Sequence, residues 1–358
     1  MERDFCGRNL RRNGVKNMMK KLNCVIAGAL AAILAVSGCS GGQSAADKYP
    51  QRDINMTVPF NAGGSTDLTG RVVGEAMGRN LGVNFVVTNT PGAGGSVGTQ
   101  NVLNAKKDGY TLLADGLLSF TSMPVMGLSD AQPADWDIWL ATFTPNIIAV
   151  RADSPYETIE DLLKDMRERP GEVSAGTAGP GSAGQIAAEL LAAGAGVAYK
   201  HVPYDGGNPA IVAALSGEVD FAPQLFVEMK DMLVAGELRG LACFDTEDMT
   251  LENGVVIPSI TKAVPELKDS LPMGETTGLL VPKGVDEEIL AKLDASFNEA
   301  MKDEAFLEFC DTKGFSVTAM GREESAAYVQ ELQSVVAWTL YDAGVAKKSP
   351  EDFEIPRP

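Results

Sequence analysis

The sequence predicts an α/β fold arranged as two lobes. Apolar runs of strand length alternate along the chain with segments whose apolar residues recur at the spacing of one helix face. This alternation is typical of sheets covered by helices. About 320 residues follow a predicted leader, more than one hydrophobic core usually holds, so two lobes are expected.

The predicted elements follow one another in order. A strand at 54–60 leads into a helix at 66–81, where apolar residues share one face. Ser182 and Gln185 form a predicted capping box, which places the start of a second prominent helix there. The other predicted strands are at 84–88, 110–114, 146–150, 219–222 and 238–244, and the other helices start near 96, 159, 208, 286 and 322.

The division into lobes depends on two places where the chain changes character. After the apolar run that ends at Val150, the composition changes at 153–155, and the apolar segment 278–281 is interpreted as the return connection. We therefore predict lobe 1 at 49–149 and 272–358, and lobe 2 at 150–271.

The N-terminal residues 1–38 have the features of a bacterial signal peptide. A short basic segment precedes an apolar run at 22–36, which is too short to span a bilayer comfortably. The run ends in VSGC, which resembles a lipobox and predicts a lipid on Cys39, with 39–48 as a flexible tether. An ordinary signal peptide with an incidental cysteine is the alternative, and residues 1–17 are interpreted as an over-extended start.

The charge of the chain excludes one class of partner. Without the leader it has 23 Lys and Arg against 46 Asp and Glu, a net charge of −23. Such a surface repels nucleic acid and anionic lipid. Cys243 and Cys310 are interpreted as two buried free thiols, with a disulfide as the alternative, and no cysteine or histidine spacing predicts a metal site.

Two glycine-rich loops are candidates for an anion site. The loops at 60–67 and 176–185 each join a strand to a helix start. Glycine lets a ligand approach the backbone closely, and a helix start offers unpaired N–H groups and partial positive charge. Neither loop contains Lys or Arg, which favours a carboxylate over a phosphate. The alternative is a pair of tight turns that bind nothing.

Other motifs do not support catalysis or a cofactor. The segment GAGGSVG at 92–98 has the spacing G-x-G-G-x-x-G, whereas dinucleotide sites need G-x-G-x-x-G, so a loop lining the cleft is favoured. His201 is the one histidine, and no G-x-S-x-G motif accompanies it. We therefore expect no catalytic residues and no cofactor, and an enzyme on a binding-protein-like fold is a minor alternative.

Six motifs in one order resemble the substrate-binding proteins of tripartite tricarboxylate transporters, the Bug-type (TctC) receptors. The resemblance runs from about Tyr49 to Ala343. Its motifs are VPFNAGGSTD at 58–67, PGAGGSVG at 91–98, DGYTLL at 108–113, HVPY at 201–204, GGNPA at 206–210 and GEVDF at 217–221.

The resemblance implies a fold and a set of ligand-binding residues. The fold is a type II-like periplasmic-binding-protein clamshell with crossing hinge strands. Its members hold a ligand carboxylate between two loops, largely through backbone amides and water. Carried onto this sequence, the ligand-binding residues are Phe60, Asn61, Ala62, Gly63, Gly64, Ser65, Thr66, Asp67, Thr177, Ala178, Gly179, Gly181, Ser182, Tyr204 and Asp205.

Two positions depart from the family pattern. Many relatives have a histidine where Gln185 stands, and often a lysine where Asp205 stands. Gln185 can keep the helix cap. Asp205 would oppose a second carboxylate and favour a hydroxyl, amide or ammonium at the far end of the ligand.

The resemblance also implies a function. We expect a monomeric, lipid-anchored, extracytoplasmic receptor that captures a small organic carboxylate and passes it to integral-membrane transporter subunits, and that meets the membrane only through its anchor. The alternative is a ligand-sensing protein that docks on a signalling receptor.

The lipid anchor is tested by Cys39→Ser. Without the thiol, no thioether to lipid can form, so the variant should leave the membrane fraction or stay unprocessed. Detergent partitioning and N-terminal mass spectrometry measure this. A cleaved variant that still partitions into detergent would disprove the anchor.

Overall fold

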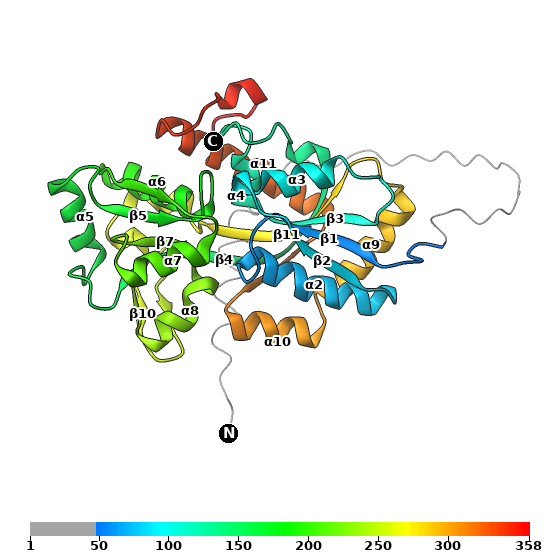
Figure 1. Ribbon diagram of the computed structural model, residues 1–358, viewed down its shortest axis with the longest axis horizontal. Coiled ribbons are helices and arrows are strands. Elements are labelled where there is room, and N and C mark those ends of the chain that lie inside the picture. Colours follow the sequence, from blue (N-terminus) through cyan, green and yellow to red (C-terminus); the bar gives the residue numbers. More distant parts are fainter. Residues whose placement is uncertain (1–47) are drawn as a thin grey trace, which may run out of the picture. The chain divides into compact units, whose positions relative to one another are not determined.

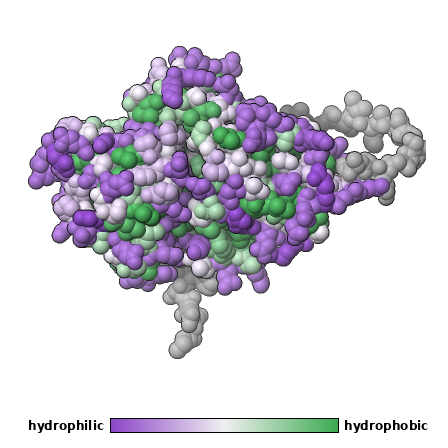
Figure 2. Space-filling model, viewed as in Figure 1, coloured by the Kyte–Doolittle hydropathy of each residue, from purple (hydrophilic) through white to green (hydrophobic). Residues whose placement is uncertain are grey.

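The computed structural model describes residues 48–358, and Tyr49–Pro358 form one unit. The predicted signal peptide and Cys39 lie outside the described residues. None of the helices between 48 and 358 combines the length and hydropathy needed to cross a bilayer. On the face in Figure 2, hydrophilic residues cover most of the surface and hydrophobic ones lie in separate small groups, in agreement with the acid-rich composition.

One long strand connects two groups of strands. Strand β4, Trp136–Arg151, pairs along its first part with β11, Gly274–Pro282, and with β12. From Asn146 onward it pairs instead with β7 and β8. Every one of these pairings is antiparallel. The chain therefore passes from one group to the other without leaving an extended conformation, and Figure 1 shows β4 and β11 running between them.

The first group is a mixed sheet with the order β12-β4-β11-β3-β1-β2. Strand β1 is parallel to both β2 and β3, whereas β11 is antiparallel to β3. The strands are β1 Ile54–Val58, β2 Phe85–Asn89, β3 Thr111–Gly116 and β12 Ser316–Met320. The helices in these stretches of chain are α2 Ser65–Leu81, α3 Ser96–Leu103, α4 Leu117–Ser122, α9 Glu287–Ala300, α10 Glu304–Lys313 and α11 Arg322–Asp342.

The second group surrounds the far half of β4. Strands β5 and β6 form a separate parallel pair, and β9 and β10 an antiparallel one. The strands are β5 Ser174–Thr177, β6 Lys200–Pro203, β7 Ala222–Leu225, β8 Leu238–Cys243, β9 Met249–Thr250 and β10 Val256–Ile257. The helices are α5 Ile159–Glu168, α6 Ala183–Ala195, α7 Gly207–Ser216 and α8 Phe226–Ala235.

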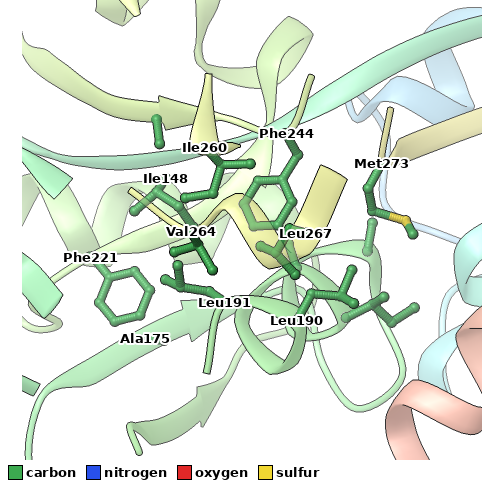
Figure 3. Packing of buried hydrophobic residues seen from close by; sticks show 14 of the residues in the cluster. Ile148, Ala175, Leu190, Leu191, Phe221, Phe244, Ile260, Val264, Leu267 and Met273 are labelled. Carbon is green, nitrogen blue, oxygen red and sulfur yellow. The ribbon is translucent and has the colours of Figure 1, made fainter. Parts of the chain in front are cut away.

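A continuous hydrophobic cluster fixes helix α6 against these strands. Figure 3 shows Leu190 and Leu191 of α6 in one cluster with Ile148 of β4, with Val264 and Leu267 between them and Phe221 and Phe244 at opposite sides. The same cluster includes Val336, Ala337, Trp338 and Leu340 of α11. Helix α11 therefore packs on the core of the second group, although β12, which comes just before it in the sequence, belongs to the first group. Because α6 is anchored in this way, its N-terminus has a fixed position.

The structure corrects several predicted elements. Strand β4 begins at Trp136, not at 146, and its partners change between Pro145 and Asn146, before the predicted connection at 153–155. The acidic and hydroxyl residues in its first half obscured the strand, although they are buried. Helices α4, α8 and α10 and strand β12 were not predicted. Cys243 and Cys310 are buried free thiols. The lobe boundaries stay predictions.

Substitution of Gly278 by alanine tests how closely the backbones of β4 and β11 approach each other. A Cβ at this position would lie 1.8 Å from the Trp139 carbonyl oxygen, beside an irregularity in the ladder. Gly278→Ala should lower the free energy of unfolding by about 1–3 kcal/mol, because a packed backbone must shift. Gly321→Ala, where nothing lies within 4 Å, is the control in urea denaturation. Equal stability of the two variants would contradict this packing.

Candidate functional site

Three helix N-termini converge on one small cavity. The cavity has a volume of about 60 Å³. The starts of α2, α6 and α7 contribute to its wall, and α4, β7, α8 and β11 complete it. Its lining residues are Phe60, Asn61, Ala62, Gly64, Ser65, Thr66, Ser119, Ala178, Ser182, Ala183, Gly184, Gly206, Gly207, Asn208, Pro209, Gln224, Leu225, Glu228 and Glu275.

Hydrogen bonds to Asp67 fix the conformation of the first loop. Gly63 has φ +90°, a left-handed conformation that favours glycine. Its N–H donates to Asp67 Oδ2 at 2.9 Å, and Asp67 also pairs with Arg71 and Asn89. Burial opposes the charge on Asp67, but these donors lower its pKa overall. Asp67 is therefore ionised, and it stabilises the conformation of the loop from the inside.

The second loop has the predicted cap with one correction. Ser182 Oγ accepts from the Gln185 N–H at 3.4 Å, as an N-cap should. The Gln185 side chain does not close the capping box on Ser182. Its Oε1 accepts instead from the Gly181 N–H at 2.7 Å. The first N–H groups of a helix have no intrahelical acceptor, and Ala183 and Gly184, the first two residues of α6, line the cavity.

Direct hydrogen bonds tie the loops around the cavity. Asn61 Nδ2 donates to the Asp205 carbonyl oxygen at 2.6 Å. Ser122 Oγ of α4 donates to the Gly181 carbonyl oxygen at 2.8 Å. These contacts join segments far apart in the sequence, so the cavity walls are held close together.

In the structure, about half of the predicted ligand-binding residues line the cavity, and the others do not. Thr177 Oγ1 lies 2.5 Å from Nε2 of His201, whose pKa is lowered by burial. Tyr204 Oη donates to Glu218, and the exposed Asp205 contributes a carbonyl oxygen to Asn61, not a cavity-lining carboxylate. Eight predicted residues line the cavity, namely Phe60, Asn61, Ala62, Gly64, Ser65, Thr66, Ala178 and Ser182, and seven do not, namely Gly63, Asp67, Thr177, Gly179, Gly181, Tyr204 and Asp205.

Two acidic residues that sequence reasoning missed line the cavity. Glu228 Oε1 accepts from the Ser65 N–H at 3.1 Å, where the sequence predicts a ligand carboxylate. Glu275 is 3% exposed, and its Oε1 accepts from the Leu118 N–H at 2.7 Å. Glu228 lies on α8, whose apolar spacing and Gly236 cap could have revealed the helix but not its orientation.

Burial raises the pKa of these carboxyls. It raises the pKa of Glu228 to about 7, against the hydrogen bond from Ser65. Burial also raises the pKa of Glu275 to about 8, and the nearby charges of Asp115 and Glu228 add to this. Burial likewise raises the pKa of Asp115, which accepts a hydrogen bond from Thr99 Oγ1, to about 8. Among residues 48–358, no group of three or more acidic, histidine or cysteine side chains could hold a metal.

The buried acids predict a pH-dependent stability. Above pH 5 and until the pH approaches 8, the folded protein keeps the proton of Glu275, whereas the unfolded chain, with a pKa near 4.5, loses it. The free energy of unfolding should therefore fall as pH rises, by about 1.4 kcal/mol per pH unit for one fully retained proton.

Glu275→Gln should make this slope less steep, because the amide cannot ionise, while Asp115 and Glu228 still contribute to it. Urea denaturation at pH 5, 6, 7 and 8 measures the difference, with the exposed Glu237→Gln as the control. Parallel stability curves for wild type and Glu275→Gln would show that Glu275 ionises normally.

Comparison with known proteins identifies the family. The sequence pattern of the tripartite tricarboxylate transporter family receptor matches residues 69–337. A UPF0065 protein from the tcbD-tcbE intergenic region of Pseudomonas sp. (strain P51) is 32% identical over 305 residues, which are 82% of this chain and 87% of that protein.

Solved structures show the same two-lobed periplasmic-binding-protein fold. The periplasmic binding protein BugD has a TM-score of 0.76 at 27% identity, over 84% of this chain and 100% of that one. MatC from Rhodopseudomonas palustris, with bound malate, has a TM-score of 0.73 at 25% identity, over 80% of this chain and 100% of that one. The chain therefore belongs to the tripartite tricarboxylate transporter family receptors, which are periplasmic solute-binding proteins and not enzymes.

Proposed function

We propose that this protein captures a small organic carboxylate outside the cytoplasm and passes it to integral-membrane transporter subunits. The observation that carries the proposal is the convergence of the α2, α6 and α7 starts on one cavity whose lining has no Lys or Arg. Helix starts favour a negative group through their N–H donors and dipole. The malate bound to the related MatC is consistent with a carboxylate ligand.

The strength of such a site is adequate for capture. A hydrogen bond to a charged group contributes about 1.5–3 kcal/mol, and a helix start adds about 0.3–1 kcal/mol. Three or four such contacts support micromolar binding, about −8.2 kcal/mol, after the cost of association. A basic side chain is therefore not required for the carboxylate.

The anchor and the partners complete the proposal. A lipid on Cys39 would keep a monomeric receptor at the outer face of the membrane or in the periplasm, near its transporter. Ligand sensing through a signalling receptor is the second candidate. Affinity purification from cross-linked membranes of the producing cells, with and without ligand, separates the two. Recovery of transporter subunits supports transport, and recovery of a signalling receptor contradicts it.

Gly64→Val tests the cavity. Gly64 has an ordinary φ of −78°, so the backbone accepts a side chain there. Its Cβ would lie 3.1 Å from Glu228 Oε1 and crowd the wall beside the Ser65 N–H. Affinity should fall at least tenfold while thermal unfolding stays cooperative.

Calorimetric titration with a panel of mono- and dicarboxylates measures this effect. Gly321→Val, at an open position with φ −74°, is the control. An unchanged dissociation constant for Gly64→Val would remove this loop from the site. Failure of wild type to bind any carboxylate would overturn the proposed function.

A further inference from the structure

Glu228 has an oxygen that needs a donor. While its Oε1 accepts from Ser65, its Oε2 is inaccessible to solvent and has no hydrogen-bond partner among the described residues, although the residue as a whole is partly exposed. A Cβ at Gly207 would lie 2.1 Å from Oε2, so the carboxyl lies against the start of α7. A buried acceptor without a partner is costly, by about 1–3 kcal/mol. In a ligand cavity, the missing donor is naturally supplied by the ligand.

Glu275 is the second acidic side chain that lines the cavity. It lines the same cavity, its side chain is almost wholly buried, and a Cβ at Gly116 would meet its carboxyl carbon at 2.4 Å. No Lys, Arg or His lines the cavity, so Glu228 and Glu275 provide its only ionisable side chains. The cavity therefore combines helix starts, which attract a negative group, with two carboxyls, which attract a positive one.

We propose that the ligand of this cavity is a small zwitterion, a carboxylate that also carries an ammonium group, with the ammonium between Glu228 and Glu275. This rests on the proposed function and narrows its ligand class. An ammonium has three donors, enough for the free Oε2 of Glu228 and for Glu275 together. A hydroxyl has one donor, and a second carboxylate has none, so neither could pair with Glu228 Oε2 and with Glu275 at the same time.

The size of the cavity points to a short ligand. A volume of about 60 Å³ corresponds to the space of about four to six water molecules. That space suits a small amino acid better than a long-chain acid. Burial raises the pKa of both acids, which favours their protonated forms. An ammonium would hold them in the ionised form.

The experiment compares ligands that share a carbon skeleton. Calorimetric titration of wild type uses alanine, lactate and propionate as one set, and aspartate, malate and succinate as the other. Within at least one set, the amino acid should bind at least tenfold more tightly than the hydroxy acid and the unsubstituted acid.

Glu228→Gln identifies the residue responsible. Glutamine keeps an oxygen for the Ser65 N–H but removes the charge, so the preference for the amino acid should fall at least tenfold. Glu275→Gln should reduce it as well and provides a second variant if the first does not fold. Glu237→Gln, exposed and outside the cavity, should keep the wild-type preference.

Each remaining outcome decides the proposal. If malate or succinate binds wild type more tightly than aspartate, and lactate or propionate more tightly than alanine, the zwitterion is wrong and carboxylate capture stands. If both glutamine variants keep the wild-type preference, these acids do not recognise the ammonium. If no ligand of either set binds, the inference and the proposed function both fail.

Discussion

The hydrogen bonding of β4 is the constraint on which the rest of the structure depends. This one strand, Trp136–Arg151, pairs with β11 and β12 along its first part and with β7 and β8 along its second. At Gly278 the backbone approach is so close that a Cβ would overlap the Trp139 carbonyl oxygen. Because the two groups of strands share one rigid backbone, the helix starts on either side face a common cavity.

The cavity combines two kinds of polar group that favour opposite charges on a ligand. The N-termini of α2, α6 and α7 supply partial positive charge, and Glu228 and Glu275 supply the opposing acids. Glu228 occupies a donor, the Ser65 N–H, that would otherwise be available to a ligand carboxylate. A site built in this way discriminates ligands by where their charges lie, not by net charge. The large negative charge of the chain gives no long-range attraction for an acid, so recognition must act at contact distance.

Local sequence signals predicted the scaffold of the site well. Glycines and small hydroxyl residues before an amphipathic segment indicated the starts of α2 and α6, and Ser182 is the N-cap that the sequence predicts. These signals act within a few residues of one another, through backbone conformation and capping. The family motifs identified the fold for the same reason, since they mark turns and helix starts. The positions of Asp205 and Tyr204 away from the cavity could not be predicted, because side-chain direction in a loop depends on its tertiary contacts.

The sequence by itself determined the alternation of strands and helices, the two glycine-rich loops and the absence of Lys and Arg from them. Only the tertiary structure decided which acids face the ligand. Glu228 is 163 residues from the Ser65 N–H to which it bonds, and Glu275 is 157 residues from that of Leu118. Among 48 acidic residues, most of which belong to polar surfaces, nothing local distinguishes these two. Their burial, and hence their raised pKa values, arises when β4 and β11 bring distant segments together around one cavity.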